Sequence, residues 1–212
     1  MADMDSGWEL AYRKKHASDR QIPHEDVESI HEVFREYQVK KILDLGCGNG
    51  RHLIYFGKRG YEMYGLDYAP TALRLAKHWL AEEGVSAEFV CTDMTKMPWA
   101  DQFFDAVICF QTINHNIIEG IRKTVREIYR VLKQSGWLFV TIGTYIPSEP
   151  FLFYSGIEVE PNTIILTEGK EKGVPHHFFT KEELITEFSL FSVVDMHQDS
   201  NERVCMLARK TE

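Results

Sequence analysis

Short apolar runs alternate with amphipathic helical patterns along residues 41–142, and this alternation limits the possible folds more than any other feature. Strands are expected over residues 41–45, 61–66, 87–91, 105–110 and 136–142. Helices are expected over residues 24–37, 51–59, 70–83 and 117–133. Strict alternation of this kind produces a parallel sheet with helices on both faces. We therefore expect an α/β, doubly wound, Rossmann-like fold.

The pattern changes after Gly143. Two short strands within residues 157–167 predict a small hairpin on the rim of the fold. Thr180 and Glu183 form a T-x-x-E capping box that begins a short helix. Two strands within residues 193–208 are joined by a polar turn, so we expect the last strand to be antiparallel. It completes a seven-stranded, mostly parallel sheet.

Charge and composition limit the classes of binding partner that this chain suits. The chain has 24 Lys and Arg against 32 Asp and Glu, a formal net charge of −8. An acidic chain is poorly suited to sequence-independent binding of nucleic acid or of an anionic membrane. No signal peptide is recognisable, and no window approaches the roughly 18 apolar residues of a membrane span. The expected protein is cytoplasmic and has neither a nucleic-acid nor a membrane partner.

The four cysteines lack C-x-x-C spacing, and each lies within or beside an apolar run. This pattern favours small buried hydrophobic residues in a reducing compartment over a disulfide or zinc framework.

The segment I-L-D-L-G-C-G-N-G, residues 42–50, leads from a strand into a turn with Gly46, Gly48 and Gly50. Glycines permit positive φ angles and allow a ligand to lie against bare backbone. In a doubly wound sheet this turn lies at the strand ends where ligands bind. The alternative is a tight turn with no ligand.

The spacing of the turn favours one class of ligand. A dinucleotide fingerprint is G-x-G-x-x-G, but here the third glycine comes one residue early and Arg51 stands in the fingerprint position. Asp44, two residues before the first glycine, would repel a diphosphate and suits an ammonium group. These residues favour an amino-acid-bearing nucleoside over NAD.

Two further carboxylates follow strands. Asp67 ends the second strand, where it can accept hydrogen bonds from both hydroxyls of a ribose. The alternative for Asp67 is a turn or helix-capping role before Pro70. Asp93 follows the third strand in C-T-D-M-T-K-M-P and supplies another acceptor on the same edge.

Over roughly residues 40–143, five segments in order resemble class I S-adenosylmethionine-dependent methyltransferases: D-L-G-C-G-N-G, G-L-D-Y-A-P, C-T-D-M-T-K-M-P, F-D-A-V-I-C-F-Q-T-I-N-H and G-W-L-F-V-T-I. The resemblance implies S-adenosylmethionine as co-substrate and S-adenosylhomocysteine as product. It implies that the glycines pass beneath the methionine portion and ribose, and that Asp67 binds the ribose hydroxyls. The implied cofactor-binding residues are Asp44, Gly46, Cys47, Gly48, Gly50, Asp67, Tyr68, Asp93, Met94 and Phe110.

The same resemblance assigns the remaining contacts. Asp93 would accept a hydrogen bond from the adenine amino group, and Met94 would pack against the adenine ring. The backbone near Phe110 would hold the ammonium group, with Asp44 nearby. The tail P-H-H-F-F-T-K-E-E-L is similar to small-molecule methyltransferases, including the tellurite-resistance branch. It departs from that branch at Gln198, where the branch carries Arg after His.

His115 is the candidate catalytic residue, as a base or a substrate contact, because it follows the fourth strand by five residues. The activated methyl group leaves the enzyme mainly to align a nucleophile and exclude water, and a base helps only when the nucleophile is protonated. His176 and His177 lie on a segment expected to return over the site. His115, His176 and Asp93 offer metal ligands, but no pair has helical spacing and no metal is expected. For all three histidines, the alternative is an ordinary loop or packing role.

Aromatic residues gather at both ends of the expected core and would wall an apolar substrate pocket, or else pack the extension and insertion on the sheet. They are Trp8, Tyr12, Phe151, Phe153 and Tyr154.

The predicted protein is a methyltransferase that acts on an O, N or S nucleophile of a small molecule, as a monomer or homodimer. The alternatives are a noncatalytic scaffold of the same fold and an NAD-dependent oxidoreductase, which the glycine spacing disfavours. One domain is expected, because no linker or repeat interrupts the sequence. Its parts are an N-terminal helical extension (1–39), a cofactor-binding core (40–143), a rim insertion (144–175) and a C-terminal helix with antiparallel strands (176–212).

Overall fold

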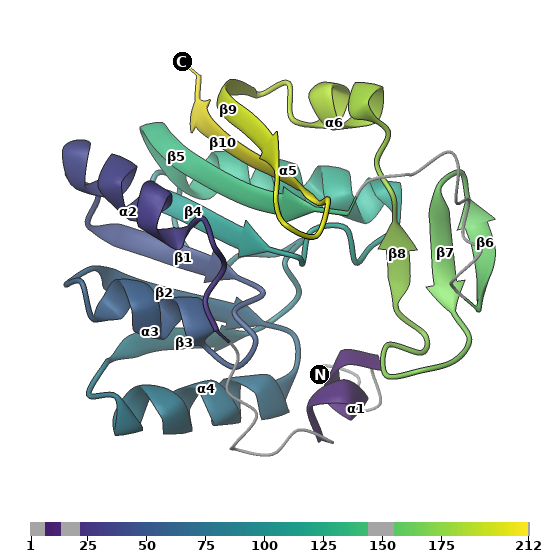
Figure 1. The fold of residues 1–212 in the computed structure, drawn as a ribbon, viewed down its shortest axis with the longest axis horizontal. Coiled ribbons are helices and arrows are strands. Elements are labelled where there is room, and N and C mark those ends of the chain that lie inside the picture. The colour runs from purple at the N-terminus through teal and green to yellow at the C-terminus, as the bar shows by residue number, and fades with distance from the viewer. Residues whose placement is uncertain (1–6, 14–21, 144–154, 212) are drawn as a thin grey trace.

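The computed structural model describes residues 7–13, 22–143 and 155–211. Their main element is a seven-stranded sheet in the order β3-β2-β1-β4-β5-β10-β9 (Figure 1). The strands are β1 (Lys41–Leu45), β2 (Glu62–Asp67), β3 (Ala87–Cys91), β4 (Phe104–Phe110), β5 (Leu132–Ile142), β9 (Phe191–Gln198) and β10 (Val204–Lys210). Strands β1 to β5 pair in parallel, and β10 is antiparallel to both of its neighbours. The expected fold, with its last strand antiparallel, is confirmed.

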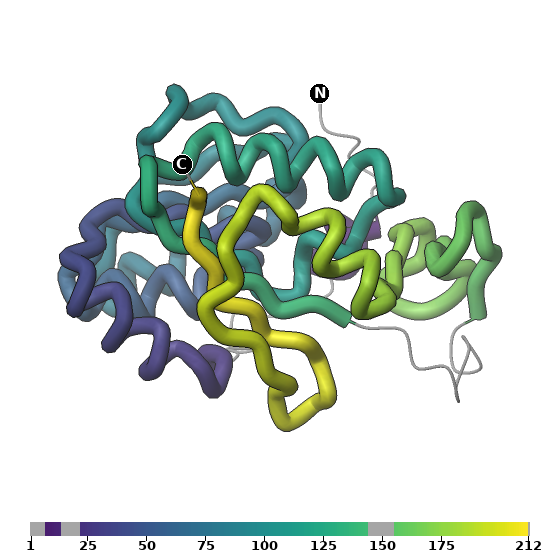
Figure 2. Tube along the Cα trace, turned by 90° about the horizontal axis from the view of Figure 1, so that it is seen from above, coloured from purple at the N-terminus to yellow at the C-terminus, as the bar shows by residue number. Residues whose placement is uncertain are grey.

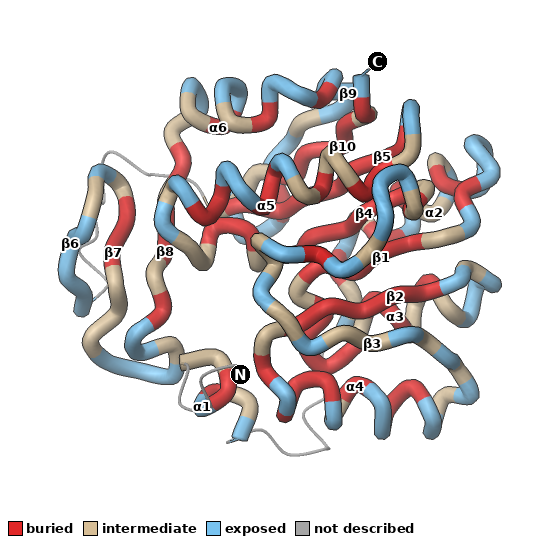
Figure 3. The backbone as a smooth tube through the Cα atoms, turned by 180° about the vertical axis from the view of Figure 1, so that it is seen from behind, coloured by how far each residue is buried: buried red, intermediate tan, exposed pale blue. Residues whose placement is uncertain are grey.

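The helices cover both faces of this sheet (Figures 1 and 3). They are α1 (Gly7–Arg13), α2 (Val27–Glu36), α3 (Arg51–Gly57), α4 (Pro70–Glu82), α5 (Ile118–Val131) and α6 (Lys181–Glu187). Apolar side chains of α2, α3 and α4 form one buried layer with the sheet, and those of α5 and α6 form the other. Alternate residues of β1 divide between the layers, because successive strand side chains point to opposite faces. Ile42 joins the first layer, and Leu43 joins the second.

A smaller sheet of β6 (Gly156–Glu160), β7 (Thr163–Leu166) and β8 (Pro175–His177) stands at one side of the molecule (Figure 2). The expected hairpin is present as the antiparallel pair β6 and β7. Strand β8 was not predicted, because three residues give no periodic signal. It pairs antiparallel with β7 and faces the carboxyl ends of β1 and β4 together with α1 (Figure 1).

Helix α1 is not evident from the sequence pattern, because its seven residues are short for an isolated helix. A tertiary contact holds it in place. Glu9 is buried, and its carboxylate accepts hydrogen bonds from the Thr71 backbone N–H (3.0 Å) and hydroxyl (2.6 Å). Thr71 lies in the first turn of α4, where a carboxylate is also favoured by the helix dipole.

Two expectations require correction. The predicted helix 117–133 ends at Val131 and β5 begins at Leu132, four residues before the predicted strand. The early start is irregular, with a register shift against β4 and a positive φ of 59° at Ser135. Cys91 is exposed, unlike the other three cysteines, because it lies at the end of edge strand β3.

The remaining boundaries agree closely with the predictions. Thr180 and Glu183 form both hydrogen bonds of the predicted capping box at the start of α6. Among the described residues, no helix has the length and apolar character needed to cross a bilayer.

Candidate active site

A cavity of about 570 Å³ lies at the carboxyl ends of β1, β2 and β4. Its wall combines the glycine turn, the segments after β2, β3 and β4, helix α1, and the segment that leads into β8. Of the predicted cofactor-binding residues, those in the wall are Gly46, Cys47, Gly48, Asp67, Tyr68, Asp93, Met94 and Phe110. The volume falls within the range of small-molecule sites.

The glycine turn presents backbone to this cavity. Gly46 and Cys47 donate their N–H groups to the Leu66 carbonyl oxygen over 2.8 and 2.9 Å, which fixes the turn against β2. Gly48 has a φ of 53°, and a Cβ added there would lie 2.4 Å from the Tyr12 hydroxyl. The turn therefore has no room for a side chain above Gly48, as expected for a backbone surface that a ligand approaches.

Gly50 does not line the cavity, contrary to the expectation for the third glycine. It has a φ of 86° and precedes the first residue of α3. A Cβ there would lie 2.9 Å from Leu80 Cδ1 and 3.1 Å from Ala76 Cβ. Glycine is needed at this position because α3 and α4 pack closely, so Gly50 has a packing role in the structure.

Asp67 is buried beside the glycine turn. Its Oδ2 accepts the Gly48 N–H and its Oδ1 accepts the Ala69 N–H, each over 2.8 Å. Burial raises the pKa of this carboxyl, and the backbone donors oppose that rise. A carboxylate has about four lone-pair sites, so both oxygens retain acceptor capacity toward a ligand. The local turn role and the ligand role that the sequence left open are therefore compatible.

Asp44 lies behind the cavity wall instead of in it, because its side chain is fully buried at 1% exposure. Burial raises the pKa of Asp44 to about 8, and the nearby Arg51 opposes that rise. Its Oδ2 has no hydrogen-bond partner among the described residues. Arg51 itself lines the cavity. The sequence analysis treated Arg51 only as a departure from the dinucleotide fingerprint and missed this position.

Phe110 closes the wall at the end of β4. Its ring stacks on the His52 imidazole with centroids 3.7 Å apart. His52 Nε2 accepts the His24 backbone N–H over 3.3 Å, and burial lowers the pKa of His52 well below its usual value. A neutral His52, which also lines the cavity, therefore packs against the Phe110 ring and helps to hold it in position.

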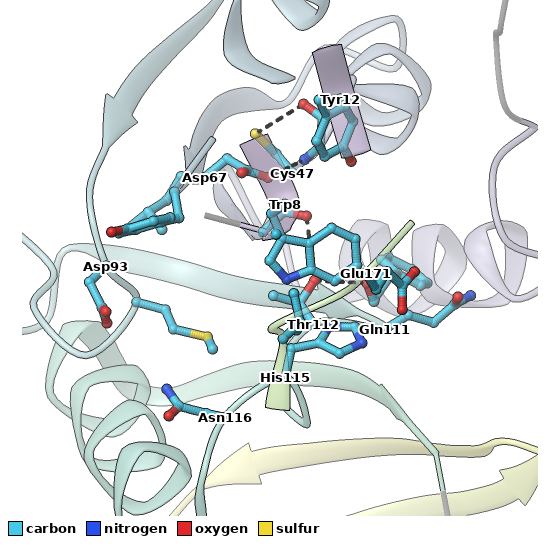
Figure 4. A pocket seen from close by; sticks show the side chains of 18 of the residues that line it. Trp8, Tyr12, Cys47, Asp67, Asp93, Gln111, Thr112, His115, Asn116 and Glu171 are labelled. Carbon is cyan, nitrogen blue, oxygen red and sulfur yellow. Dashed lines mark hydrogen bonds between the residues drawn. The ribbon is translucent and has the colours of Figure 1, made fainter. Parts of the chain in front are cut away.

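Asp93 and Met94 lie in the loop after β3 and line the cavity, with Asp93 on the side of Asp67 (Figure 4). Asp93 is exposed, and its Oδ1 accepts the Thr95 N–H over 2.7 Å. This bond orients the carboxyl within its loop and leaves Oδ2 available as an acceptor.

The opposite end of the cavity is lined by Trp8 and His115 (Figure 4). The His115 ring contacts Trp8 at 4.8 Å and His176 at 4.7 Å between centroids, both edge-on. Burial lowers the pKa of His115 to about 3 and that of His176 to about 4. Both rings are neutral at pH 7. An imidazole with a pKa this low is a weak base, so the site favours a contact role for His115 over proton abstraction.

The segment that contains His176 and His177 returns over the cavity, as expected, but the two histidines differ in their contacts. His176 contacts His115, whereas His177 turns into the fold, where its Nδ1 lies 2.8 Å from the Thr163 hydroxyl. The His177 backbone N–H donates to the Asn114 carbonyl oxygen over 2.8 Å and attaches β8 to the loop after β4. Glu171, which sequence reasoning missed, also lines the cavity. No local pattern distinguishes Glu171, because β8 alone determines its position.

The aromatic wall is confirmed in part. Trp8 and Tyr12 line the cavity, and burial raises the pKa of Tyr12 so that its hydroxyl stays protonated. Phe151, Phe153 and Tyr154 lie outside the described residues.

Comparison with known proteins gives a consistent result. Residues 43–140 match the family model described as a methyltransferase domain. An uncharacterized methyltransferase, YcgJ, of Bacillus subtilis is 32% identical over 113 residues, which cover 53% of this chain and 44% of that protein. A ubiquinone biosynthesis O-methyltransferase of Chromobacterium violaceum is 33% identical over 104 residues, covering 47% and 43%. The matched regions thus span less than half the length of these relatives.

A solved structure extends the likeness beyond the matched region. A SAM-dependent methyltransferase from Methanosarcina mazei superposes with a TM-score of 0.73 at 20% identity, covering 84% of this chain and 97% of that one. The sheet order and the cavity at the glycine turn define a Rossmann-like protein of the methyltransferase type. Residues 43–140 therefore match a methyltransferase domain, and the proteins that this chain is similar to include methyltransferases.

Proposed function

We propose that this protein transfers the methyl group of S-adenosylmethionine to a nucleophilic O, N or S atom of a small molecule. One observation carries the proposal. The bare backbone of the glycine turn, the Asp67 carboxylate and the His115 ring all line one cavity of about 570 Å³. A single cavity of this size allows the cofactor and a small acceptor to be held in contact, and such alignment is the main requirement of methyl transfer.

The residues present fit the cofactor. Gly46 and Gly48 present bare backbone to the cavity, so a ligand could contact this backbone without a side chain between them. Asp67 would accept from the ribose hydroxyls, and Asp93 would accept from the adenine amino group beside Met94. Arg51 places a cation in the same wall, where it would attract the carboxylate of the methionine portion. When bound, the sulfonium supplies an activated methyl group.

Several observations support a small acceptor. Trp8 and Tyr12 of α1 form part of the cavity wall, and the Trp8 ring limits the space beside His115. The formal net charge of −8 is unfavourable for docking a nucleic acid. The related protein from Chromobacterium violaceum is named for ubiquinone biosynthesis O-methylation, which is chemistry on a small molecule.

Thermal unfolding with S-adenosylmethionine, S-adenosylhomocysteine and NAD tests the cofactor. A ligand at a hundredfold excess over its Kd stabilises the folded state by about 2.7 kcal/mol. Stabilisation by the two S-adenosyl compounds and not by NAD is expected. Stabilisation by NAD alone would instead support an oxidoreductase. Stabilisation by none of the three would support a scaffold without ligand.

Activity requires a second measurement. We expect the protein to release S-adenosylhomocysteine from S-adenosylmethionine when incubated with one member of a panel of phenols, amines and thiols. The Asp67→Ala variant serves as the negative control in each reaction. Binding of the cofactor without turnover on any acceptor class would favour the noncatalytic alternative.

A further inference from the structure

Three side chains that are distant in sequence meet at the acceptor end of the cavity. His115 follows β4, Glu171 precedes β8, and His176 lies within β8. One ligand atom from each lies within 4.8 Å of the other two. Two histidines and one carboxylate form a typical ligand set for a divalent transition metal.

The spacing within this cluster suits a metal. His176 Nε2 lies 3.3 Å from Glu171 Oε2. Two atoms bound to one tetrahedral zinc, each at about 2.0–2.1 Å, lie about 3.3 Å apart. The His115 ring is 4.7 Å from the His176 ring between centroids, so the third candidate ligand lies next to this pair.

One nitrogen of the cluster is buried without a hydrogen bond. His176 is only 6% exposed, and its Nε2 forms no hydrogen bond with any described residue. A buried nitrogen in this state loses the free energy of its missing hydrogen bond. A cation bound at Nε2 would give this nitrogen a partner.

Other histidine clusters in the described part of the chain have protein partners. His24 Nε2 lies 3.0 Å from Asp199 Oδ2, and that same oxygen accepts from Arg203 over 2.9 Å. His197 lies 2.7 Å from Asp195 and 3.1 Å from Asp26. The residues of these clusters do not line the cavity, whereas His115 and Glu171 do, so the His115 cluster is the stronger candidate for a metal that meets an acceptor.

We propose that His115, Glu171 and His176 bind one divalent transition metal ion, such as Zn²⁺ or Co²⁺, that holds the nucleophilic atom of the acceptor. The sequence analysis expected no metal because His115 and His176 lack helical spacing. Strand β8 brings them together in the fold, whereas Asp93, the third ligand considered there, lies on the Asp67 side of the cavity (Figure 4). The metal site does not depend on the proposed function, but the role of the metal toward the acceptor does.

The chemistry at this site balances without any further reagent. An acceptor hydroxyl or thiol bound at the open metal position loses its proton to water more readily, because the metal lowers its pKa. The resulting O⁻ or S⁻ then donates its electron pair to the methyl carbon of the sulfonium. The carbon–sulfur bond breaks, and its electrons remain on sulfur as S-adenosylhomocysteine. This arrangement supplies a nucleophile without a protein base.

The test is titration of the full chain, stripped with a chelator, with Co²⁺ alone. Binding is followed by visible absorption and calorimetry in the absence of cofactor. We expect one Co²⁺ per chain, with the d–d absorption of a four- or five-coordinate site. His176→Gln and Glu171→Gln should each weaken binding by roughly tenfold to hundredfold, at least the loss seen when an outer-shell partner is removed. Melting temperatures of the variants establish that they remain folded.

The matched control is His197→Gln, which removes a histidine from another cluster and should leave Co²⁺ binding unchanged. Unchanged binding in both His176→Gln and Glu171→Gln, loss of binding in His197→Gln, or no Co²⁺ binding by the parent protein would each overturn the site. Calorimetry with S-adenosylhomocysteine on the same samples tests the proposed function separately. Asp67→Ala should lose affinity for that ligand and retain Co²⁺.

Discussion

The Gly48 backbone N–H donates a 2.8 Å hydrogen bond to Asp67 Oδ2, so the turn after β1 is tied to the residue that ends β2. One carboxylate therefore shapes the glycine turn and lines the cavity beside it. The two roles must be separated in any experiment on Asp67, because loss of the carboxylate also leaves the Gly48 and Ala69 donors without their partner.

Asp67→Ala should weaken binding of S-adenosylhomocysteine roughly ten- to hundredfold, because hydrogen bonds to a charged acceptor contribute about 1.5–3 kcal/mol. It should also lower the melting temperature. Asp105→Asn is the matched control, since Asp105 Oδ2 accepts the backbone N–H groups of Lys40 and Lys41 away from the cavity wall. The control should lower stability with affinity unchanged by calorimetry. Equal affinities in both variants would remove Asp67 from ligand binding.

Gly48→Val should abolish measurable binding of S-adenosylhomocysteine, because a side chain there would displace Tyr12 and cover the bare backbone of the cavity wall. The positive φ of 53° adds backbone strain of about 1–3 kcal/mol. Gly84→Val carries a similar strain at φ 66°, but its added Cβ meets nothing within 4 Å. The melting temperature of both variants should fall, and only Gly48→Val should lose affinity for S-adenosylhomocysteine. Normal affinity in folded Gly48→Val would mean that the ligand lies elsewhere.

Stability should fall as the pH falls from about 6.5 toward 4. Burial lowers the pKa of His176 to about 4, so the unfolded chain takes up a proton near pH 6.5 and the folded chain does not. The unfolded state then binds more protons, and the free energy of unfolding declines by up to about 1.4 kcal/mol per pH unit for each such group. His176→Gln should flatten this slope relative to the parent protein, measured by urea unfolding with a chelator present. Parallel pH profiles of the two proteins would contradict the buried neutral state.

Thr180→Ala should destabilise the protein by about 1 kcal/mol, because it removes the side-chain acceptor for the Glu183 N–H at the start of α6. Thr180→Ser retains a hydroxyl at the same position and should restore most of the loss. Urea unfolding of the three proteins gives the comparison. A loss in Thr180→Ser as large as in Thr180→Ala would show that the methyl group matters more than the cap.

Much of the fold is predictable because its signals are local. Strands β1 and β3 begin and end at the predicted residues, and the capping box identifies the start of α6. Helix α1 and strand β8 were missed because contacts distant in sequence hold them. Glu9 meets Thr71 across 62 residues, and β8 depends on its pairing with β7.

The residues of the site also divide into those that local sequence predicts and those that it does not. The glycine turn and Asp67 follow their strands directly, so strand prediction located them. Glu171 was missed as a wall residue because no local pattern distinguishes it, and Arg51 was missed although it directly follows the glycine turn as the first residue of α3. Gly50 was misassigned since a glycine required by the close approach of α4 and one required by a ligand look identical in sequence.

The hydrogen bonds between Glu9 and Thr71 also have a consequence for the residence time of whatever the cavity holds. They anchor α1, whose Tyr12 hydroxyl stands directly over Gly48. Because α1 forms part of the cavity wall, we expect a molecule on the glycine turn to leave more slowly while this anchor is intact. The rate of release would then depend on a seven-residue helix that one buried carboxylate holds in place.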